Sequence, residues 1–383
     1  MVKILKILQV CPCYVDLENE IGGVSNVVRQ ICNHAAQAGH IVTLICGNRE
    51  LKRICSPPYS KTHRSGIHQV VLDQRSHPWM GPFQEVIKAI DMNKPFDVAH
   101  VHTCFSSFTE MAMHYLAKTH TPFIFSPHGK LSPNMLSKQG VMKKVWWHLF
   151  CRRCVENTSA YGMFSQDEII YLKRMKIKDR KFLSIPNGFQ AIGGCDNLPR
   201  PISEPYVLFL GYIEPRKQPG LVVQAFAQTK IRDTHRLIIV GPDAYDHRSA
   251  VETVAGELKV TDRVIFWGPA YGAEKWALLQ HAKCLCLPSL AEGQPVVVSE
   301  AMGVGLPCIV SREANCTFVC QNGAGMMVNS FDPGQWAAAI EKICEDTEFH
   351  EKMSKAAKQL GEKLTWEKIV QRWCTVYSDI AKN

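Results

Sequence analysis

Short aliphatic runs alternate with segments of helical spacing along the first half of the chain. Runs that are apolar throughout are typical of strands buried on both faces, and alternation with helices is typical of βαβ units. The pattern therefore predicts a parallel sheet covered by helices. The expected strands are Ile4–Val10, Ile41–Cys46, Ile67–Leu72, Val98–Val101, Phe123–Phe125 and Phe182–Ile185, with helices that include Val24–Ala38 and Phe108–Thr119.

The alternation stops near residue 190 and then starts again. Residues 190–205, QAIGGCDNLPRPISEP, are rich in Gly and Pro and are typical of a linker. We therefore expect two Rossmann-like domains, 1–195 and 201–365, facing each other across a deep cleft, an α/β architecture. The second set of strands is Tyr206–Leu210, Leu237–Val240, Val264–Trp267, Cys284–Leu287 and Cys308–Val310, and terminal helices are expected at Trp336–Glu345, His350–Leu360 and Trp366–Ala381.

The composition is that of a globular protein with a large core. The 383 residues are 46% hydrophobic and 21% charged, and no apolar run approaches the roughly 20 residues of a membrane span. The 16 cysteines are irregularly spaced, and Cys151-x-x-Cys154 lacks a second ligand pair. Together with the absence of a visible secretory signal, this favours a cytoplasmic location with reduced thiols.

The positive charge lies in the first half of the chain. Residues 1–200 contain 25 Lys and Arg against 14 Asp and Glu, whereas residues 201–383 contain 19 against 21. Two basic segments stand out, 138–153 with two Trp and 171–182 with six cations. A basic aromatic helix suits contact with an anionic membrane, but packing of its aromatic residues in the core is an equal alternative. No nucleic-acid motif is present, so we expect no nucleic-acid partner.

Chemistry-bearing residues follow several of the expected strands in the first half. Gly22-Gly23 lies between the first strand and the first helix, where backbone amides can approach a ligand. His102 ends one strand, and His128 lies in the turn SPHGKL after the next. Active sites form beyond the carboxyl ends of parallel strands, so His102 and His128 are candidate site residues, while His100 is expected to pack in the core.

The loops that open the second half carry candidate phosphate ligands. Arg216 and Lys217 follow the strand that ends at Gly211, just before a helix, and two cations at a helix start suit a diphosphate. Asn187, in the turn Asn187-Gly188, is expected near the interdomain crevice.

The stretch AEGQPVVVSE, residues 291–300, places two carboxylates around an expected helix start. The helix should begin near Pro295, so that free backbone N–H groups around Gln294 to Val297 form an anion site, with Gln294, Pro295 and Val296 as candidate donor-binding residues. Carboxylates accept hydrogen bonds from hydroxyl groups. Glu292 and Glu300 on either side of an anion site therefore indicate a ligand with hydroxyls, phosphates and further hydroxyls, which is a nucleotide sugar.

These motifs resemble the family 4 retaining glycosyltransferases of GT-B fold over nearly the whole chain. The string SLAEGQPVVVSEAMGVGLPCIV matches the two-glutamate motif of that family, and Gly22-Gly23-Val24, PHGKL, IPNG and TWEK are further matches. The resemblance implies that the terminal helix, 366–383, crosses back to the first domain. It also implies a donor held mainly by the second domain and an acceptor held mainly by the first.

The resemblance also implies roles for individual residues. Glu292 is similar to the glutamate near the hydroxyls of the donor sugar, Glu300 to the ribose ligand and Lys217 to the diphosphate lysine. Gly23 matches a position close to the phosphates or the acceptor, and His128 matches a histidine at the reaction centre. One departure is Tyr212, because family members commonly carry arginine there. Arg216 is a candidate to supply the lost charge.

The expected function is transfer of a hexose-type sugar, with retention, from a UDP- or GDP-linked donor to a saccharide or lipid-linked acceptor in glycan assembly. No Asp-x-Asp pair or ligand cluster is seen, so we expect neither a metal nor a cofactor. The expected place is the cytoplasm or the cytoplasmic face of a membrane. Two alternatives stay open at this point, a sugar-nucleotide 2-epimerase of GT-B fold and a non-catalytic nucleotide-sugar-binding protein.

Overall fold

The structure is a computed structural model of the chain, and it divides into two compact units. The first unit joins Met1–Pro186 to Trp366–Asn383, and the second is Asn187–Thr365. The second unit thus begins at Asn187, earlier than residue 201, while the last helix belongs to the first unit as expected. The residues described are 3–19, 23–48, 59–63, 65–73, 83–131, 140–164, 166–178, 180–190 and 198–382, so residues 191–197 of the expected linker lie outside them.

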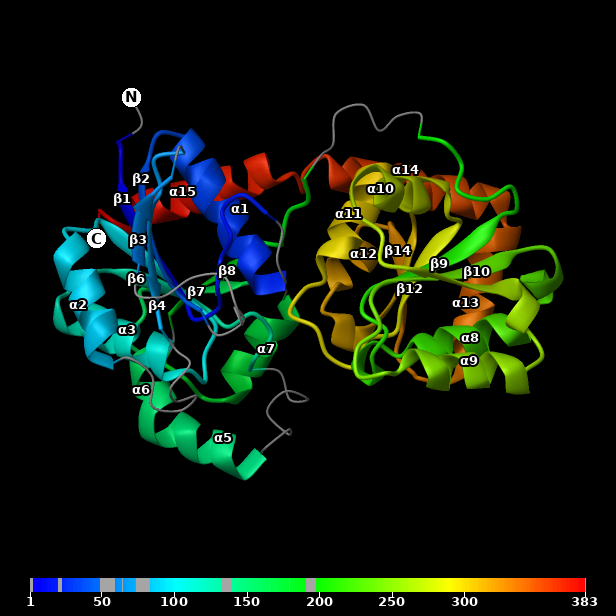
Figure 1. Cartoon of the computed structure of the whole chain (residues 1–383), viewed down its shortest axis with the longest axis horizontal. Helices are drawn as coiled ribbons and strands as arrows, with labels where there is room; N and C mark the ends of the chain where they lie inside the picture. The colour runs from blue at the N-terminus through cyan, green and yellow to red at the C-terminus, as the bar shows by residue number, and fades with distance from the viewer. Residues whose placement is uncertain are drawn as a thin grey trace. The chain divides into compact units, whose positions relative to one another are not determined.

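The first unit contains an eight-stranded sheet with the order β3-β4-β2-β1-β5-β6-β7-β8 (Figure 1). All neighbours are parallel except β3 and β4. The expected strands are present with ends shifted by a few residues at most. The strands are β1 Lys6–Cys11, β2 Ile41–Gly47, β3 Tyr59–Thr62, β4 His68–Leu72, β5 Val98–His102, β6 Phe123–Ser126, β7 Ala160–Met163 and β8 Lys181–Ser184.

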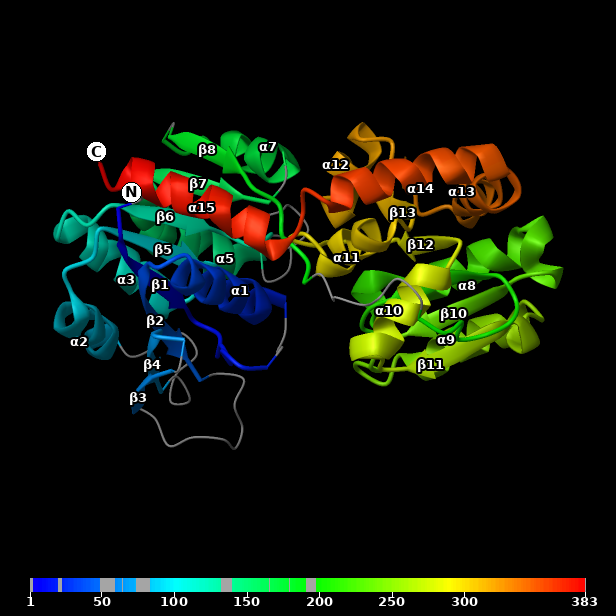
Figure 2. The same ribbon diagram turned by 90° about the horizontal axis from the view of Figure 1, so that it is seen from above.

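Helices cover both faces of this sheet. The C-terminal helix α15 (Trp366–Ile380) packs beside α1 (Gly23–Gln37), as Figure 2 shows. The remaining helices of the unit are α2 Phe83–Asn93, α3 Ser107–Lys118, α5 Gly140–Trp146, the π-helical turn η1 Trp147–Cys151, α6 Arg152–Val155 and α7 Gln166–Arg174.

Alternation along β1 and β5 gives the two faces of the sheet different chemistry. Leu8 and Val10 join an apolar core that includes residues of α2, α3 and α6. Gln9 lies between them in sequence and therefore points to the other face. There it is paired in register with His100 of β5 and contacts Tyr377 of α15. Along β1 and β5, one face thus carries apolar side chains, and the other carries buried polar groups.

The second unit contains a six-stranded parallel sheet with the order β11-β10-β9-β12-β13-β14. Its strands are β9 Tyr206–Leu210, β10 Arg236–Val240, β11 Val264–Gly268, β12 Cys284–Leu287, β13 Cys308–Ser311 and β14 Gly325–Val328. Its helices are α8 Pro219–Gln228, α9 Arg248–Glu257, α10 Gly272–His281, α11 Val296–Val304, α12 Thr317–Gln321, α13 Pro333–Glu345 and α14 Thr347–Gly361, with 3₁₀ turns η3 Pro215–Lys217, η4 Lys230–Asp233, η5 Thr261–Arg263 and η6 Arg312–Ala314.

The strand order of each sheet contains a point where the direction of winding reverses. In the second unit α8 and α9 lie on one side of the sheet and α10 and α11 on the other, so the reversal falls between β9 and β12 (Figure 1). In the first unit the corresponding neighbours are β1 and β5. Ligands of open α/β sheets bind beyond the carboxyl ends of such strands, which directs attention to the loops after them.

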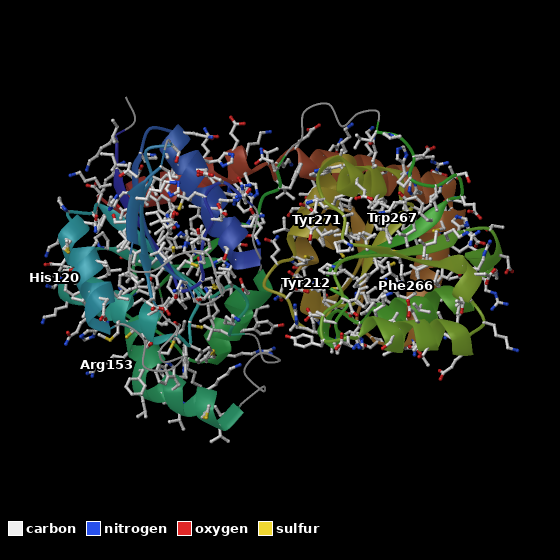
Figure 3. All side chains as sticks on the ribbon, viewed as in Figure 1. His120, Arg153, Tyr212, Phe266, Trp267 and Tyr271 are labelled. Atoms are coloured by element: carbon white, nitrogen blue, oxygen red, sulfur yellow. The ribbon has the colours of Figure 1, made fainter. Side chains whose placement is uncertain are left out.

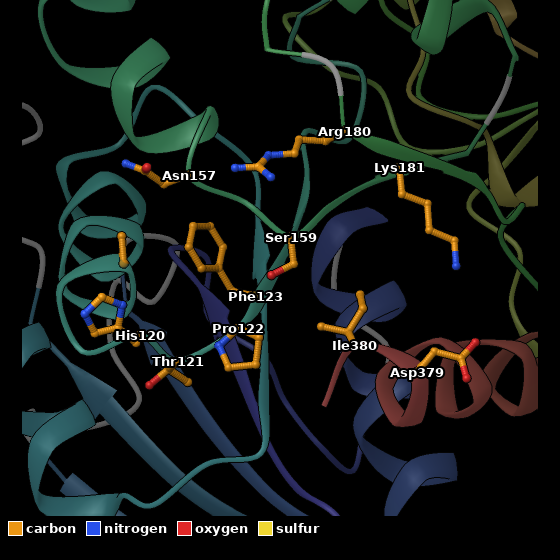
Figure 4. Close-up of a pocket in the computed structure, with 11 residues that line it drawn as sticks. His120, Thr121, Pro122, Phe123, Asn157, Ser159, Arg180, Lys181, Asp379 and Ile380 are labelled. Atoms are coloured by element: carbon orange, nitrogen blue, oxygen red, sulfur yellow. The ribbon is translucent and has the colours of Figure 1, made fainter. Parts of the chain in front are cut away.

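A pocket of about 560 Å³ lies at the opposite edge of the first sheet (Figure 4). Its lining includes Pro122 and Phe123 at the start of β6, Ser159 before β7 and Lys181 at the start of β8. These are amino ends of parallel strands, away from the edge at which open α/β sheets bind their ligands. We therefore do not place the functional site there.

The cysteines and helices add two further facts. All cysteines that the structure describes are free thiols, and burial raises the pKa of Cys154 to about 12.

Within the described ranges, no helix combines the length and the apolar character that crossing a membrane requires.

Candidate functional site

The N-terminus of α11 forms the centre of the site in the second unit. Pro295 has extended backbone dihedral angles and is the N-cap residue of the helix. The helix begins at Val296, so Pro295 precedes the first turn and is not its first residue. The Val298 N–H bonds to the Pro295 carbonyl, so the amides of Val296 and Val297 precede the first intrahelical bond. The sequence predicts an anion site at this helix start, where these amides and the helix dipole lie.

Glu292 forms ion pairs with both cations of the loop after β9. Its Oε1 lies 2.7 Å from Lys217 Nζ, and its Oε2 lies 3.1 Å from an Arg216 guanidinium nitrogen. Arg216 also pairs with Glu214 at 2.5 Å and donates to the Ala291 carbonyl. A backbone bond from Leu290 N–H to the Arg216 carbonyl completes the connection between the two loops. The structure thus brings the three predicted residues together at the reversal point of the sheet.

The charges of this cluster balance. Burial alone would raise the pKa of the Glu292 carboxyl, but Lys217 and Arg216 hold this pKa below its usual value. Burial alone would lower the pKa of the Arg216 guanidinium, but the carboxylates of Glu292 and Glu214 raise this pKa above its usual value. Two carboxylates and two cations give a net charge of zero. Lys217 has three N–H donors, however, and Glu292 Oε1 accepts from one of them.

Asn187 is held against the start of α11. Its backbone N–H donates to Gln294 Oε1, its side-chain amide donates to the Gln294 carbonyl at 3.0 Å, and its carbonyl accepts from Ser299 Oγ at 2.9 Å. These bonds place Asn187 beside the two-glutamate segment, whereas its predicted position near the interdomain crevice stays a prediction. Asn187 Oδ1, Gln294 Nε2 and Asn315 Oδ1 are buried polar atoms without a hydrogen-bond partner among the residues that the structure describes. Buried polar atoms are rarely left unpaired, so such a group marks a place for a polar ligand.

Glu300 lies in the second turn of α11 and is buried. Its Oε1 accepts from Lys275 Nζ of α10 at 2.7 Å. Lys275 could not be predicted from the sequence, because it lies 25 residues from Glu300 on a helix where it stands next to the exposed Glu274. The ion pair orients the Glu300 carboxylate.

Tyr212 is largely exposed, with 52% of its surface accessible, and Figure 3 shows it at the surface of the second unit. It makes no ion pair in the described part of the chain. The carboxylates of Glu214 and Glu292 instead meet Arg216. Arg216 therefore lies in the charged cluster after β9, and its expected role toward a diphosphate stays a prediction.

In the first unit, His102 and His128 are in direct contact. His102 Nδ1 lies 2.9 Å from His128 Nε2, and their ring centroids are 5.1 Å apart. Burial, with a smaller contribution from Lys130, lowers the pKa of His128 to about 3, so its imidazole is neutral at pH 7. Burial likewise lowers the pKa of His102 well below its usual value. The histidine expected in the core, His100, is fully buried against Trp373.

The turn that carries His128 is tightly held. His128 and Gly129 both have positive φ, 52° and 74°, a conformation that most residues other than glycine avoid. Buried Glu168 of α7 fixes the turn, because its carboxylate accepts from Gly129 N–H at 2.6 Å and from Phe164 N–H at 2.9 Å. Sequence reasoning missed Glu168, whose only signal was a carboxylate among apolar residues. A strained, clamped turn after a strand is typical of a functional residue.

The Gly-Gly loop is described only in part. Gly22 lies outside the described residues, whereas Gly23 is the first residue of α1 and is exposed. A Cβ at position 23 would meet nothing within 4 Å, so the backbone there is open to a ligand.

The basic aromatic segment divides between core and surface. Trp147 is buried, as the packing alternative expected, but a row of apolar side chains is exposed. We call this row the α5 stripe; it comprises Val141, Met142, Val145, Leu149 and Phe150, which are 51–79% exposed. Exposed Lys144 and Arg153 accompany it, and Figure 3 shows Arg153 pointing outward. The residues 138–139 of this segment lie outside the described ranges.

No metal site is found within the described residues, since they contain no group of three or more His, Cys, Asp or Glu side chains able to hold an ion. The expectation of a metal-independent reaction stays a prediction.

Two protein-family models cover the chain in succession. Residues 21–191 match the model "Glycosyltransferase Family 4", and residues 196–360 match "Glycosyl transferases group 1". The two sheets and the two-glutamate site define a protein of the glycosyltransferase class with a GT-B fold. More specifically, the chain belongs to the family 4 glycosyltransferases, as its motifs predicted.

Curated relatives match the chain over about half of its length. A D-inositol 3-phosphate glycosyltransferase of Corynebacterium glutamicum (strain R) is 28% identical over 195 residues, which are 48% of this chain and 45% of that protein. The enzyme of the same description from Salinispora arenicola is 28% identical over 182 residues, or 45% and 41%. The match therefore spans less than half of the length of these relatives.

Solved structures match over nearly the whole chain. A sucrose-phosphate synthase from Thermosynechococcus elongatus has a TM-score of 0.77 at 21% identity, with 98% of this chain and 99% of that chain covered. HepE from Anabaena, solved with UDP and glucose, has a TM-score of 0.70 at 16% identity and coverage of 98% and 100%. These similarities establish the GT-B fold.

Proposed function

We propose that the protein is a retaining glycosyltransferase that moves a hexose-type sugar from a nucleoside diphosphate to a saccharide or lipid-linked acceptor. The observation that carries this proposal is the convergence of the α11 N-terminus, Lys217, Glu292 and Glu300 where the second sheet reverses. Amides and a cation suit the diphosphate, and the two carboxylates suit hydroxyl groups. HepE was solved with UDP and glucose, which supports a donor of this class.

The proposed reaction needs stabilisation of the leaving diphosphate. The acceptor oxygen forms a bond to the anomeric carbon while the bond from that carbon to the phosphate oxygen breaks. The acceptor proton passes to a phosphate oxygen on the same face, which preserves the configuration. Lys217 and the amides of Val296 and Val297 meet the developing charge. His128 orients the sugar, and Glu300 holds the ribose.

A second part of the proposal concerns the acceptor side. The α5 stripe with Lys144 and Arg153 suits the surface of an anionic bilayer, where apolar side chains enter the interface and cations meet lipid headgroups. The basic segment 171–182 adds exposed cations in the same unit, among them Lys173 and Arg174. A lipid-linked acceptor at the cytoplasmic face of a membrane accounts for both features.

A panel of nucleotide sugars in a thermal-unfolding assay tests donor recognition. A bound donor stabilises the fold by about 2.7 kcal/mol at a hundredfold excess over Kd. We expect a UDP- or GDP-linked hexose to raise Tm in the wild type and not in Glu300→Ala. No shift with any donor contradicts the proposal.

A further inference from the structure

A chain of five hydrogen bonds leads from His128 through Tyr377 of the C-terminal helix to Ser126 of β6. From His128 Nε2 it passes to His102 Nδ1 at 2.9 Å, and from His102 Nε2 to Gln9 Oε1 at 2.8 Å. Gln9 Nε2 then donates to the Tyr377 hydroxyl at 3.2 Å. The hydroxyl lies 2.8 Å from His100 Nδ1, and His100 Nε2 lies 2.8 Å from Ser126 Oγ.

The members of this chain are costly to bury and are completely connected. Gln9, His100, His102 and Ser126 have no accessible surface, although they lie on a sheet whose other face is apolar. Burial of such groups is tolerated only where each polar atom finds a partner. Apolar side chains of similar size could fill the same space. The polar network therefore indicates a function, which we look for in its effect on the protonation of His128.

The direction of each bond is fixed by the bond before it. The carbonyl oxygen Gln9 Oε1 only accepts, so His102 carries its proton on Nε2. The pKa of His102 is lowered by burial, so its ring is neutral and Nδ1 is an acceptor. His128 must therefore donate from Nε2, which leaves Nδ1 as the acceptor nitrogen of His128.

Tyr377 continues the direction that the Gln9 amide sets, because a hydroxyl can both accept and donate. With the amide nitrogen of Gln9 toward the hydroxyl, Tyr377 accepts from Gln9 and donates to His100 Nδ1. A reversed Gln9 amide would reverse every bond and place the proton of His128 on Nδ1. The tautomer of His128 is thus coupled to the orientation of one amide group.

We propose that Gln9 and Tyr377 are positioning residues that hold His128 as the Nε2–H tautomer, so that Nδ1 accepts a hydrogen bond from a sugar hydroxyl. The inference rests on the proposed function for the hydroxyl ligand, but the tautomer is a property of the protein alone. Neutral His128 in this state is a hydrogen-bond acceptor and not a proton donor toward the substrate.

Nitrogen NMR of protein labelled with ¹⁵N-histidine reads the tautomer directly, with His128→Asn used to assign the signals. Tyr377→Phe keeps the aromatic ring on α15 and removes the hydroxyl, so the Gln9 amide nitrogen loses the acceptor that it has in the wild type. The matched control is Tyr161→Phe, which removes another buried hydroxyl of this unit, one that donates to the Lys178 carbonyl and has no link to Gln9.

We expect wild type and Tyr161→Phe to show His128 protonated on Nε2, and Tyr377→Phe to show both tautomers. Because activity scales with the competent fraction, kcat/KM in Tyr377→Phe should fall about two- to tenfold relative to Tyr161→Phe at similar Tm. An Nδ1–H signal for His128 in the wild type, or a Tyr377→Phe variant with unchanged tautomer, overturns the inference. If the tautomers behave as expected but His128→Asn retains full turnover, the role of His128 in the proposed function fails instead.

Discussion

The ammonium of Lys217 lies 2.7 Å from Glu292 Oε1, and this ion pair joins the loop after β9 to the loop after β12. Both side chains are almost buried, at 10% and 11% exposure, so the pair is little screened by water. It holds a cation beside the first amides of α11, where a diphosphate is proposed to bind.

Lys217→Met should separate the structural and chemical roles of this pair. Loss of one donor to developing charge costs about 2.7–4 kcal/mol, so kcat should fall about 10²- to 10³-fold. Tm should also fall, because Glu292 loses a partner in a buried site. The double variant Lys217→Met/Glu292→Gln removes that uncompensated charge and should recover Tm but not kcat. Recovery of turnover in the double variant would show that Lys217 only neutralises Glu292.

Glu300→Gln should weaken nucleotide binding. A hydrogen bond to a charged group contributes about 1.5–3 kcal/mol, so the Kd for the preferred nucleoside diphosphate should rise about 10- to 150-fold in calorimetry. The 2′,3′-dideoxy nucleotide is the control ligand, and both proteins should bind it equally. Glu274→Gln is the control variant, since Glu274 lies on α10 and accepts from Trp267 Nε1 away from Glu300. Equal affinities of wild type and Glu300→Gln for the natural nucleotide would remove the ribose assignment.

Much of the fold and of the second-unit site could be predicted from the sequence, because uninterrupted aliphatic runs such as Tyr206–Leu210 reflect burial on both faces. The strand β7 was missed for a physical reason. It has only four residues, and one of them is Gly162, where a Cβ would lie 2.3 Å from Ser126 Oγ. Close packing therefore requires glycine at a position where an aliphatic residue would have indicated a strand.

The supporting contacts of the site could not be predicted. Lys275 reaches Glu300 only because α10 and α11 are neighbours in space. Gln9 and Tyr377 are separated by 368 positions, and neither side chain belongs to a motif. Local patterns identify residues at strand ends, whereas partners that orient them depend on the packing of distant elements.

Acid should destabilise the protein through its buried neutral histidines. The pKa of His100, His102 and His128 is lowered in the folded state, to about 3 for His128, from an ordinary value of 6.5. Below pH 6.5 the unfolded chain binds protons that the folded chain does not, so stability is full above 6.5 and is lost as the pH falls toward 3. Each such histidine contributes about 1.4 kcal/mol per pH unit to the slope of the free energy of unfolding against pH in this range.

Urea unfolding between pH 7.5 and 5 measures this slope. His102→Gln should reduce it by the contribution of one histidine. His148→Gln, at an exposed position, is the control and should leave the slope as in the wild type. An identical slope in His102→Gln and wild type would contradict the assignment.

The α5 stripe should bind anionic vesicles. Leu149→Glu and Phe150→Glu place charge at apolar positions of the stripe and should each reduce co-sedimentation with phosphatidylserine-containing vesicles at least about tenfold. Met92→Glu changes an equally accessible apolar residue on α2, 73% exposed, and should have no effect. Salt should weaken binding, because about 1 kcal/mol per cation comes from headgroup attraction. If the wild type binds vesicles with and without anionic lipid equally well, the proposed role of the α5 stripe in binding anionic membranes is contradicted.

The most direct test of the central claim is release of nucleoside diphosphate from a panel of UDP- and GDP-linked hexoses, measured with and without saccharide or lipid-linked acceptors. The account predicts release by the wild type that an acceptor accelerates, a glycosylated product with retained configuration, and loss of both in Lys217→Met. Conversion of the sugar nucleotide without any acceptor product, or binding of the donor with no turnover under any condition, would contradict it.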